Sequence, residues 1–171
     1  MTPAVRILVS ALLLALAACA SPPPPPPVPA GPAPEAMVAA IRAAAGPDGQ
    51  ELNVQPLRDT MVEDLRRQAA ELERKHLYRA SADALDRAIA INPEDPALLQ
   101  ERAEAGVLLR DFQGAETLAQ RAYVQGAQVG PLCRRHWATI EQVRKARGDA
   151  AGATAARTKL DACTVAPPPR Y

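Results

Sequence analysis

The residues with the most versatile side-chain chemistry are three cysteines and two histidines. Cys133 and His136 form a C-x-x-H pattern, which is half of a typical zinc site, but no second ligand pair follows at a suitable spacing. The sequence also lacks His-Glu-x-x-His, a phosphate-binding glycine loop and Gly-x-Ser-x-Gly. We therefore expect no enzymatic activity, no metal and no cofactor, and we expect Cys133 and His136 to lie on a helix surface.

Cys19 stands between an apolar segment and six prolines. Residues 1–18 hold one charge, Arg6, and then an apolar run of roughly 12 residues, which is typical of a secretory signal and too short to span a bilayer. The stretch Leu16-Ala17-Ala18-Cys19 resembles the lipobox of bacterial lipoproteins. This resemblance implies cleavage before Cys19, a lipid on its sulfur and an acylated N-terminus. The alternative is an uncleaved anchor beside an accidental cysteine.

The resemblance to lipoproteins also implies a location. Ala20, rather than aspartate, follows the cysteine, which implies an outer-membrane anchor that faces the periplasm. Without Arg6 the mature chain has 19 basic and 19 acidic side chains, compared with 20 and 19 in the whole sequence. A net charge of zero gives no support for binding nucleic acid or an anionic membrane surface.

Composition divides the mature chain into four parts. Residues 19–34 hold the lipidated cysteine and a Pro-rich linker, which predicts a tether on the order of 40 Å in polyproline II form, with a ligand for a proline-binding groove as the alternative. Residues 35–59 should contain a short helix at 35–45 and an irregular segment. Helical periodicity occupies 60–164, starting at a capping box of Thr60 and Glu63. Residues 165–171 form a Pro-rich tail that we predict to be disordered.

The helical region repeats with a period of 34 residues, and the later predicted helices cover 80–91, 97–110, 112–125, 132–147 and 149–163. The stretches AIAINPEDP (88–96) and RDFQGA (110–115) resemble the ending and the inter-helix turn of the tetratricopeptide repeat. The third unit needs about four inserted residues. The resemblance implies an all-α fold, a short α-solenoid of about three antiparallel helix pairs. Small residues should lie where helices approach closely, at Ala69, Ser81, Ala103, Ala115 and Ala153.

The first repeat departs from the family pattern, because His76 stands where the turn usually has glycine. One continuous helix over 61–91 is therefore the alternative for this part of the chain.

Cys133 and Cys163 remain as thiols once Cys19 carries lipid, and the implied compartment is oxidising. In the third helix pair that the repeat resemblance implies, Cys133 begins the first helix and Cys163 ends the second, so the two ends should meet. We predict a disulfide, which would stabilise the fold by roughly 3 kcal/mol on the chain-entropy model. Two unpaired thiols are the alternative.

Tetratricopeptide stacks bind peptides or proteins on a concave face that the first helix of each pair lines. The resemblance places six candidate partner-binding residues there: Arg66, Arg67, Gln100, Glu104, Gln142 and Lys145. The family's carboxylate clamp is not implied, because Ala70 and Glu101 stand where asparagines would be expected.

The sequence thus predicts an outer-membrane-anchored periplasmic lipoprotein that binds a protein or peptide partner as an adaptor or assembly factor. Two other roles remain open. One is a structural or self-associating envelope lipoprotein, and the other is an accessory regulator of a cell-wall enzyme.

Overall fold

The computed structural model describes residues 31–46 and 59–164. Within these ranges the chain forms seven helices and no strand, so the expected all-α class is confirmed. The predicted signal segment, Cys19, most of the Pro-rich linker, most of the predicted irregular segment and the tail at 165–171 lie outside the described residues. No helix in the described ranges is long and apolar enough to cross a membrane. The helices are α2 (Pro34–Ala43), α3 (Thr60–Arg74), α4 (Tyr78–Ile91), α5 (Pro96–Leu108), α6 (Phe112–Gln125), α7 (Gly130–Ala146) and α8 (Ala150–Ala162).

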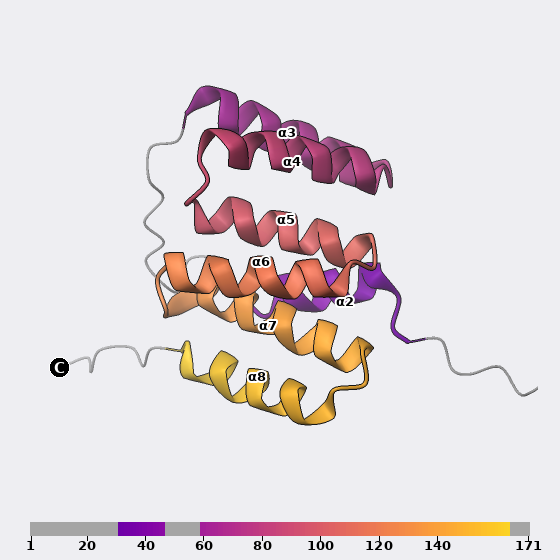
Figure 1. The fold of residues 1–171 in the computed structure, drawn as a ribbon, viewed down its shortest axis with the longest axis vertical. Helices are drawn as coiled ribbons and strands as arrows, with labels where there is room; N and C mark the ends of the chain where they lie inside the picture. Colours follow the sequence, from indigo (N-terminus) through magenta and orange to yellow (C-terminus); the bar gives the residue numbers. More distant parts are fainter. Residues whose placement is uncertain (1–30, 47–58, 165–171) are drawn as a thin grey trace, which may run out of the picture. The chain divides into compact units, whose positions relative to one another are not determined.

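The helices α3 to α8 lie side by side in chain order, each packed against the next (Figure 1). The turns after α3, α5 and α7 each contain one residue with positive φ: His76 at 57°, Arg110 at 60° and Gly148 at 78°. His76 and Arg110 are about 34 positions apart, and Gly148 follows after about 38, which is the period plus the expected insertion. Because α3 ends at Arg74 and α4 begins at Tyr78, a continuous helix over 61–91 is excluded.

Most of these helices have an aspartate as their N-cap residue. Asp95, Asp111 and Asp149 accept hydrogen bonds from backbone N–H groups in the first turns of α5, α6 and α8. The predicted capping box at Thr60 is wrong, because the N-cap is Asp59, whose carboxylate accepts from the N–H of Met61 at 2.7 Å. An aspartate one residue earlier satisfies the free amide, so Thr60 becomes the first helical residue.

The small residues predicted at close helix approaches are all buried: Ala69, Ser81, Ala103, Ala115 and Ala153. The Ser81 hydroxyl on α4 donates to the carbonyl oxygen of Ala69 on α3 at 2.9 Å. A Cβ on Gly106 of α5 would lie 3.3 Å from the Ala115 Cβ on α6. Larger side chains at these positions would therefore push the two backbones of each contact apart.

Helix α2 packs on α5 and α7, a partner that the sequence did not reveal. Its Met37, Val38 and Ile41 are at most 3% exposed and join a core cluster with Val107 and Val143. Burying three side chains of this size contributes on the order of 1.5–3 kcal/mol each. The helix is thus held by apolar packing against two helices that are not its neighbours in the chain.

Candidate functional site

The six candidate residues lie on α3, α5 and α7, but their environments differ. Gln100 and Glu104 are fully buried. Gln142 is half-buried, and Lys145 is exposed and paired with Glu141 at 2.5 Å. Arg66 and Arg67 line a pocket of about 680 Å³ to which α2, α4, α5 and α7 also contribute lining residues. The central part of the predicted binding face, on α5, is therefore closed, whereas residues on α3 and α7 remain accessible.

Helix α2 covers the central part of the face through Arg42. Its Nε donates to Oε2 of Glu104 at 2.8 Å, and its Nη1 donates to Oε1 of Glu73 on α3 at 2.7 Å. The pKa of Arg42 is raised, first by the hydrogen bond to Glu73 and also by the charge of Glu104. On the other side of Glu104, Nε of Arg135 on α7 donates to Oε1 at 3.0 Å. Each oxygen of this buried carboxylate thus meets a guanidinium, which compensates its loss of water.

A buried hydrogen-bond network extends from Glu104. The Gln100 Nε2 donates to Glu104 Oε1 and to the Thr139 hydroxyl oxygen, at 2.8 Å in both cases. A carboxylate only accepts, so the amide orientation is fixed and Gln100 Oε1 must face Nδ1 of His136 at 2.7 Å. His136 therefore carries its hydrogen on Nδ1. The network links α5 to α7 beneath the part of the face that α2 covers.

The surface position predicted for Cys133 and His136 is wrong, since both residues are fully buried. Burial, reinforced by the charge of Arg135, lowers the pKa of His136 to about 3. Within the part of the chain that is described, its Nε2 has no hydrogen-bond partner. The network partner Gln100 is 36 positions away from His136 in the chain, so no local pattern indicated this burial.

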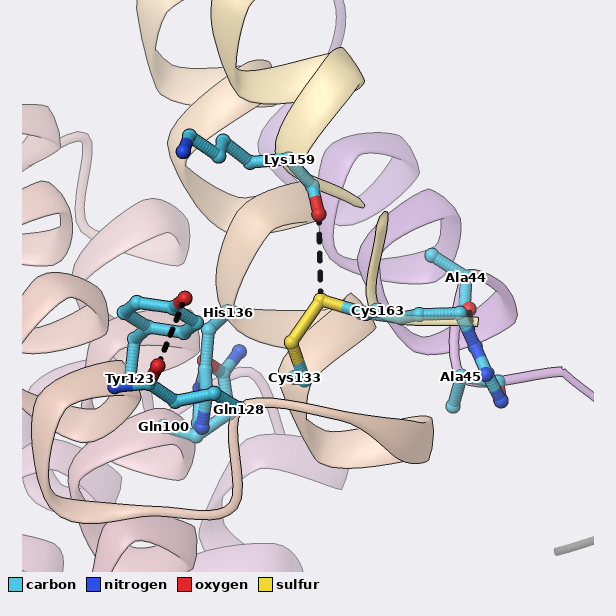
Figure 2. Close-up of a disulfide and its surroundings, with 10 residues drawn as sticks. Ala44, Ala45, Gln100, Tyr123, Gln128, Cys133, His136, Lys159 and Cys163 are labelled. Carbon is cyan, nitrogen blue, oxygen red and sulfur yellow. Dashed lines mark hydrogen bonds between the residues drawn. A yellow bond between two sulfur atoms is a disulfide. The ribbon is translucent and has the colours of Figure 1, made fainter. Parts of the chain in front are cut away.

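Cys133 and Cys163 form a disulfide with a Cα–Cα distance of 5.7 Å (Figure 2). This is the pairing that the sequence predicted, and it joins the start of α7 to the residue after α8. The backbone N–H of Gly130 donates to the carbonyl oxygen of Cys163 at 2.8 Å beside it. The bond removes Cys133 from any metal site. The described residues contain no group of three or more His, Cys, Asp or Glu side chains that could hold an ion.

Arg134, next to the disulfide, holds the end of α2. Its Nε donates to the carbonyl oxygen of Ala44 at 3.1 Å, and its Nη2 donates to that of Ala45. Figure 2 shows these two alanines near Cys163. The last carbonyls of a helix lack intrahelical partners, and a guanidinium satisfies them while favouring the negative end of the helix dipole.

The start of α2 has a separate attachment. The Tyr78 hydroxyl donates to Oε1 of Glu35 at 2.9 Å, and Nδ1 of His76 lies 2.7 Å from the same hydroxyl. Because the hydroxyl hydrogen goes to Glu35, His76 Nδ1 must be the donor in the second contact. These contacts could not be predicted from the sequence, because no pattern in residues 35–45 indicates a contact with the turn after α3.

The open pocket is lined mainly by charged and small side chains. Arg66 donates Nε to Oε2 of Glu101 at 3.0 Å and Nη1 to Oε1 of Glu63 at 3.0 Å. The pKa of Arg66 is raised, chiefly by its hydrogen bonding to Glu101. Arg67 pairs with Asp64 at the pocket rim. The charges that line the pocket are thus engaged with one another, so the pocket is not simply a cationic site.

Comparisons with known proteins find similarity among solved structures. No protein-family model matches the chain, and no curated protein matches it. Among solved structures, it is similar to the globular C-terminal domain of LpoP from P. aeruginosa, with a TM-score of 0.58 and 29% identity. The match covers 61% of this chain and 99% of that domain. This chain therefore resembles the LpoP domain over nearly the whole length of that domain.

Proposed function

We propose that this chain is a lipid-anchored protein of the bacterial cell envelope whose helical domain contacts a cell-wall enzyme and regulates it. The resemblance to almost the whole LpoP domain is the observation that carries this proposal, and it favours the accessory role over a general adaptor or a structural lipoprotein. In this role Cys19 anchors the chain in the outer membrane, and the Pro-rich linker extends the domain into the periplasm.

We further infer that α3–α8 are three repeats of tetratricopeptide type. The recurring positive φ at His76, Arg110 and Gly148 supports this assignment, since it marks the same position in each inter-helix turn. The close contact of Gly106 with Ala115 supports it too, because small residues let paired helices approach. A scaffold of this kind recognises a protein by shape and surface chemistry, which suits a regulator that acts by contact.

The proposal is tested with a purified penicillin-binding protein from the same organism, which polymerises lipid-linked precursor into glycan strands. Mature protein carrying Cys19→Ser is added at increasing concentration, and the polymerisation rate is measured together with direct binding. We expect a saturable rise in rate that parallels binding. An unrelated helical protein at equal concentration serves as the control. Absence of both binding and a rate change across the organism's penicillin-binding proteins would count against the accessory role.

A further inference from the structure

We propose that α2 is a built-in ligand of this domain, and that the surface beneath it on α5 and α7 is a binding site for a short amphipathic helix. Such a helix carries three apolar side chains on one face and an arginine directly after the last of them. In α2 these residues are Met37, Val38, Ile41 and Arg42. This inference goes beyond the regulation of an enzyme, because it concerns a site that the chain itself occupies.

The position of α2 in the fold supports its separate role. Helices α3–α8 pack in sequence, whereas α2 packs on α5 and α7 and lies outside that order. The LpoP match covers 61% of 171 residues, or about 104 residues, which is the length of α3–α8. The LpoP domain, of which 99% is matched, is thus about as long as the stack of helices α3–α8. The packing of α2 on α5 and α7, out of chain order, sets it apart from this stack.

The apolar contacts have the pattern of a helix bound in a groove. Met37, Val38 and Ile41 occupy one face of α2, at positions i, i+1 and i+4, and all three are buried. They cluster with Val107 of α5 and with Ala138 and Val143 of α7. Helical ligands are commonly anchored by apolar side chains at such spacing. The opposite face of α2, including Ala39, remains exposed.

The buried carboxylate of Glu104 makes the site selective for a cation. Glu104 is fully buried, and Arg42 supplies the guanidinium to its Oε2 at 2.8 Å. A helix without a cation at this position would leave that oxygen without its charged partner, which is strongly unfavourable in a buried site. Arg134 provides a second contact, which does not depend on sequence, because its guanidinium binds the free carbonyls at the end of whichever helix lies there.

Occupation by α2 has a direct consequence for recognition. While α2 is bound, Gln100 and Glu104 cannot reach another protein. A partner that uses the centre of the α5–α7 surface must present a helix of the same pattern and replace α2. Helix α2, which follows the Pro-rich linker in the chain, therefore determines whether the centre of the α5–α7 surface is accessible.

The test uses mature chain with Cys19→Ser and a fluorescein-labelled peptide of residues 31–46. Ile41→Asp places a charge at a fully buried position and should release α2, whereas Ala39→Asp places the same charge on the exposed face of α2. We expect the Ile41→Asp chain to keep a cooperative thermal transition and to bind one peptide. The unmodified chain and Ala39→Asp should bind none, since their site is occupied. A peptide with Arg42→Glu should bind at least tenfold more weakly.

Three results would overturn the inference. Loss of the cooperative transition in Ile41→Asp would make α2 an integral part of the core. A folded Ile41→Asp chain that binds no peptide would mean that the surface is not a helix-binding site. Equal peptide binding by the unmodified chain would mean that α2 does not occupy it. The assay needs no other protein, so its outcome is independent of the proposed enzyme partner.

Discussion

Arg42 and Glu104 are 62 residues apart in the sequence, and Arg42 Nε lies 2.8 Å from Oε2 of Glu104 in the fold. The carboxylate is fully buried, while the guanidinium is partly exposed and also reaches Glu73. This contact ties α2 to α5 and connects the first described helix to the polar core of the domain.

Arg42→Ala should weaken the docking of α2 by about 1–3 kcal/mol, because a buried carboxylate loses one of its charged partners. Hydrogen exchange would report this as faster exchange of amides at 37–44, with protection of α3–α8 retained. Arg67→Ala is the matched control, because Arg67 forms an exposed pair with Asp64 that should contribute little. Unchanged exchange in α2 would show that Arg42 does not hold it.

The pH dependence of stability should depend on His136. Its pKa is about 3 in the folded chain and about 6.5 in an unfolded one. Between these values the unfolded chain binds one more proton, so the free energy of unfolding falls by about 1.4 kcal/mol per unit decrease in pH. This loss begins near pH 6.5 and ends near pH 3.

His136→Asn provides the comparison, because its amide can still donate toward Gln100 but does not titrate. Urea unfolding of both proteins at pH 7.5, 6.0 and 5.0 measures the effect. The two stability curves should converge as the pH falls. Parallel curves would show that His136 does not control this dependence.

Much of the helical region could be predicted from sequence. Alanine and serine at a spacing of 34, such as Ala69 with Ala103, marked close helix contacts that the fold contains. Aspartate caps such as Asp95 and glycines such as Gly148 fixed the breaks between helices. These signals are local, because a cap or a turn depends on a few adjacent residues.

The long-range polar contacts could not be predicted in this way. Glu104 and Gln100 carry polar side chains at positions that the repeat resemblance assigned to a solvated binding face, yet both are buried. Their burial depends on Arg42 and His136, whose positions relative to α5 are set by packing and not by local pattern. For the same reason the partner of α2 was not visible in its alanine-rich sequence.

The disulfide should contribute substantially to stability. Replacing both Cys133 and Cys163 by alanine opens a loop of 30 residues and should lower the free energy of unfolding by about 3 kcal/mol. Thermal unfolding of the double variant would measure this loss. Addition of reductant should lower the midpoint of the unmodified chain and leave the variant unchanged. If mass measurement of non-reduced protein finds both thiols open to alkylation, the bond is absent.

The turn residues offer a test of backbone conformation. Arg110 has a φ of 60°, a region that costs a non-glycine residue about 1 kcal/mol, so Arg110→Gly should stabilise the domain by about that amount. Gly148→Ala should destabilise it by a similar amount, since Gly148 has a φ of 78° and open space around it. Arg87→Gly, at an exposed position in the interior of α4, should instead lower the free energy of unfolding by about 1 kcal/mol. Chemical denaturation of the three variants would measure whether the free energy of unfolding rises or falls in each. A lower free energy of unfolding for Arg110→Gly would refute the strain argument.

Crosslinking in living cells tests the proposed function most directly. A photo-reactive residue is placed at Arg67 in the anchored protein, on the rim of the open pocket, and crosslinked partners are identified by mass spectrometry. A parallel strain carries Cys19→Ala. We expect one dominant partner, a cell-wall enzyme, whose crosslink is lost in the Cys19→Ala strain. Crosslinks only between copies of this chain, or a dominant partner outside cell-wall synthesis, would contradict it.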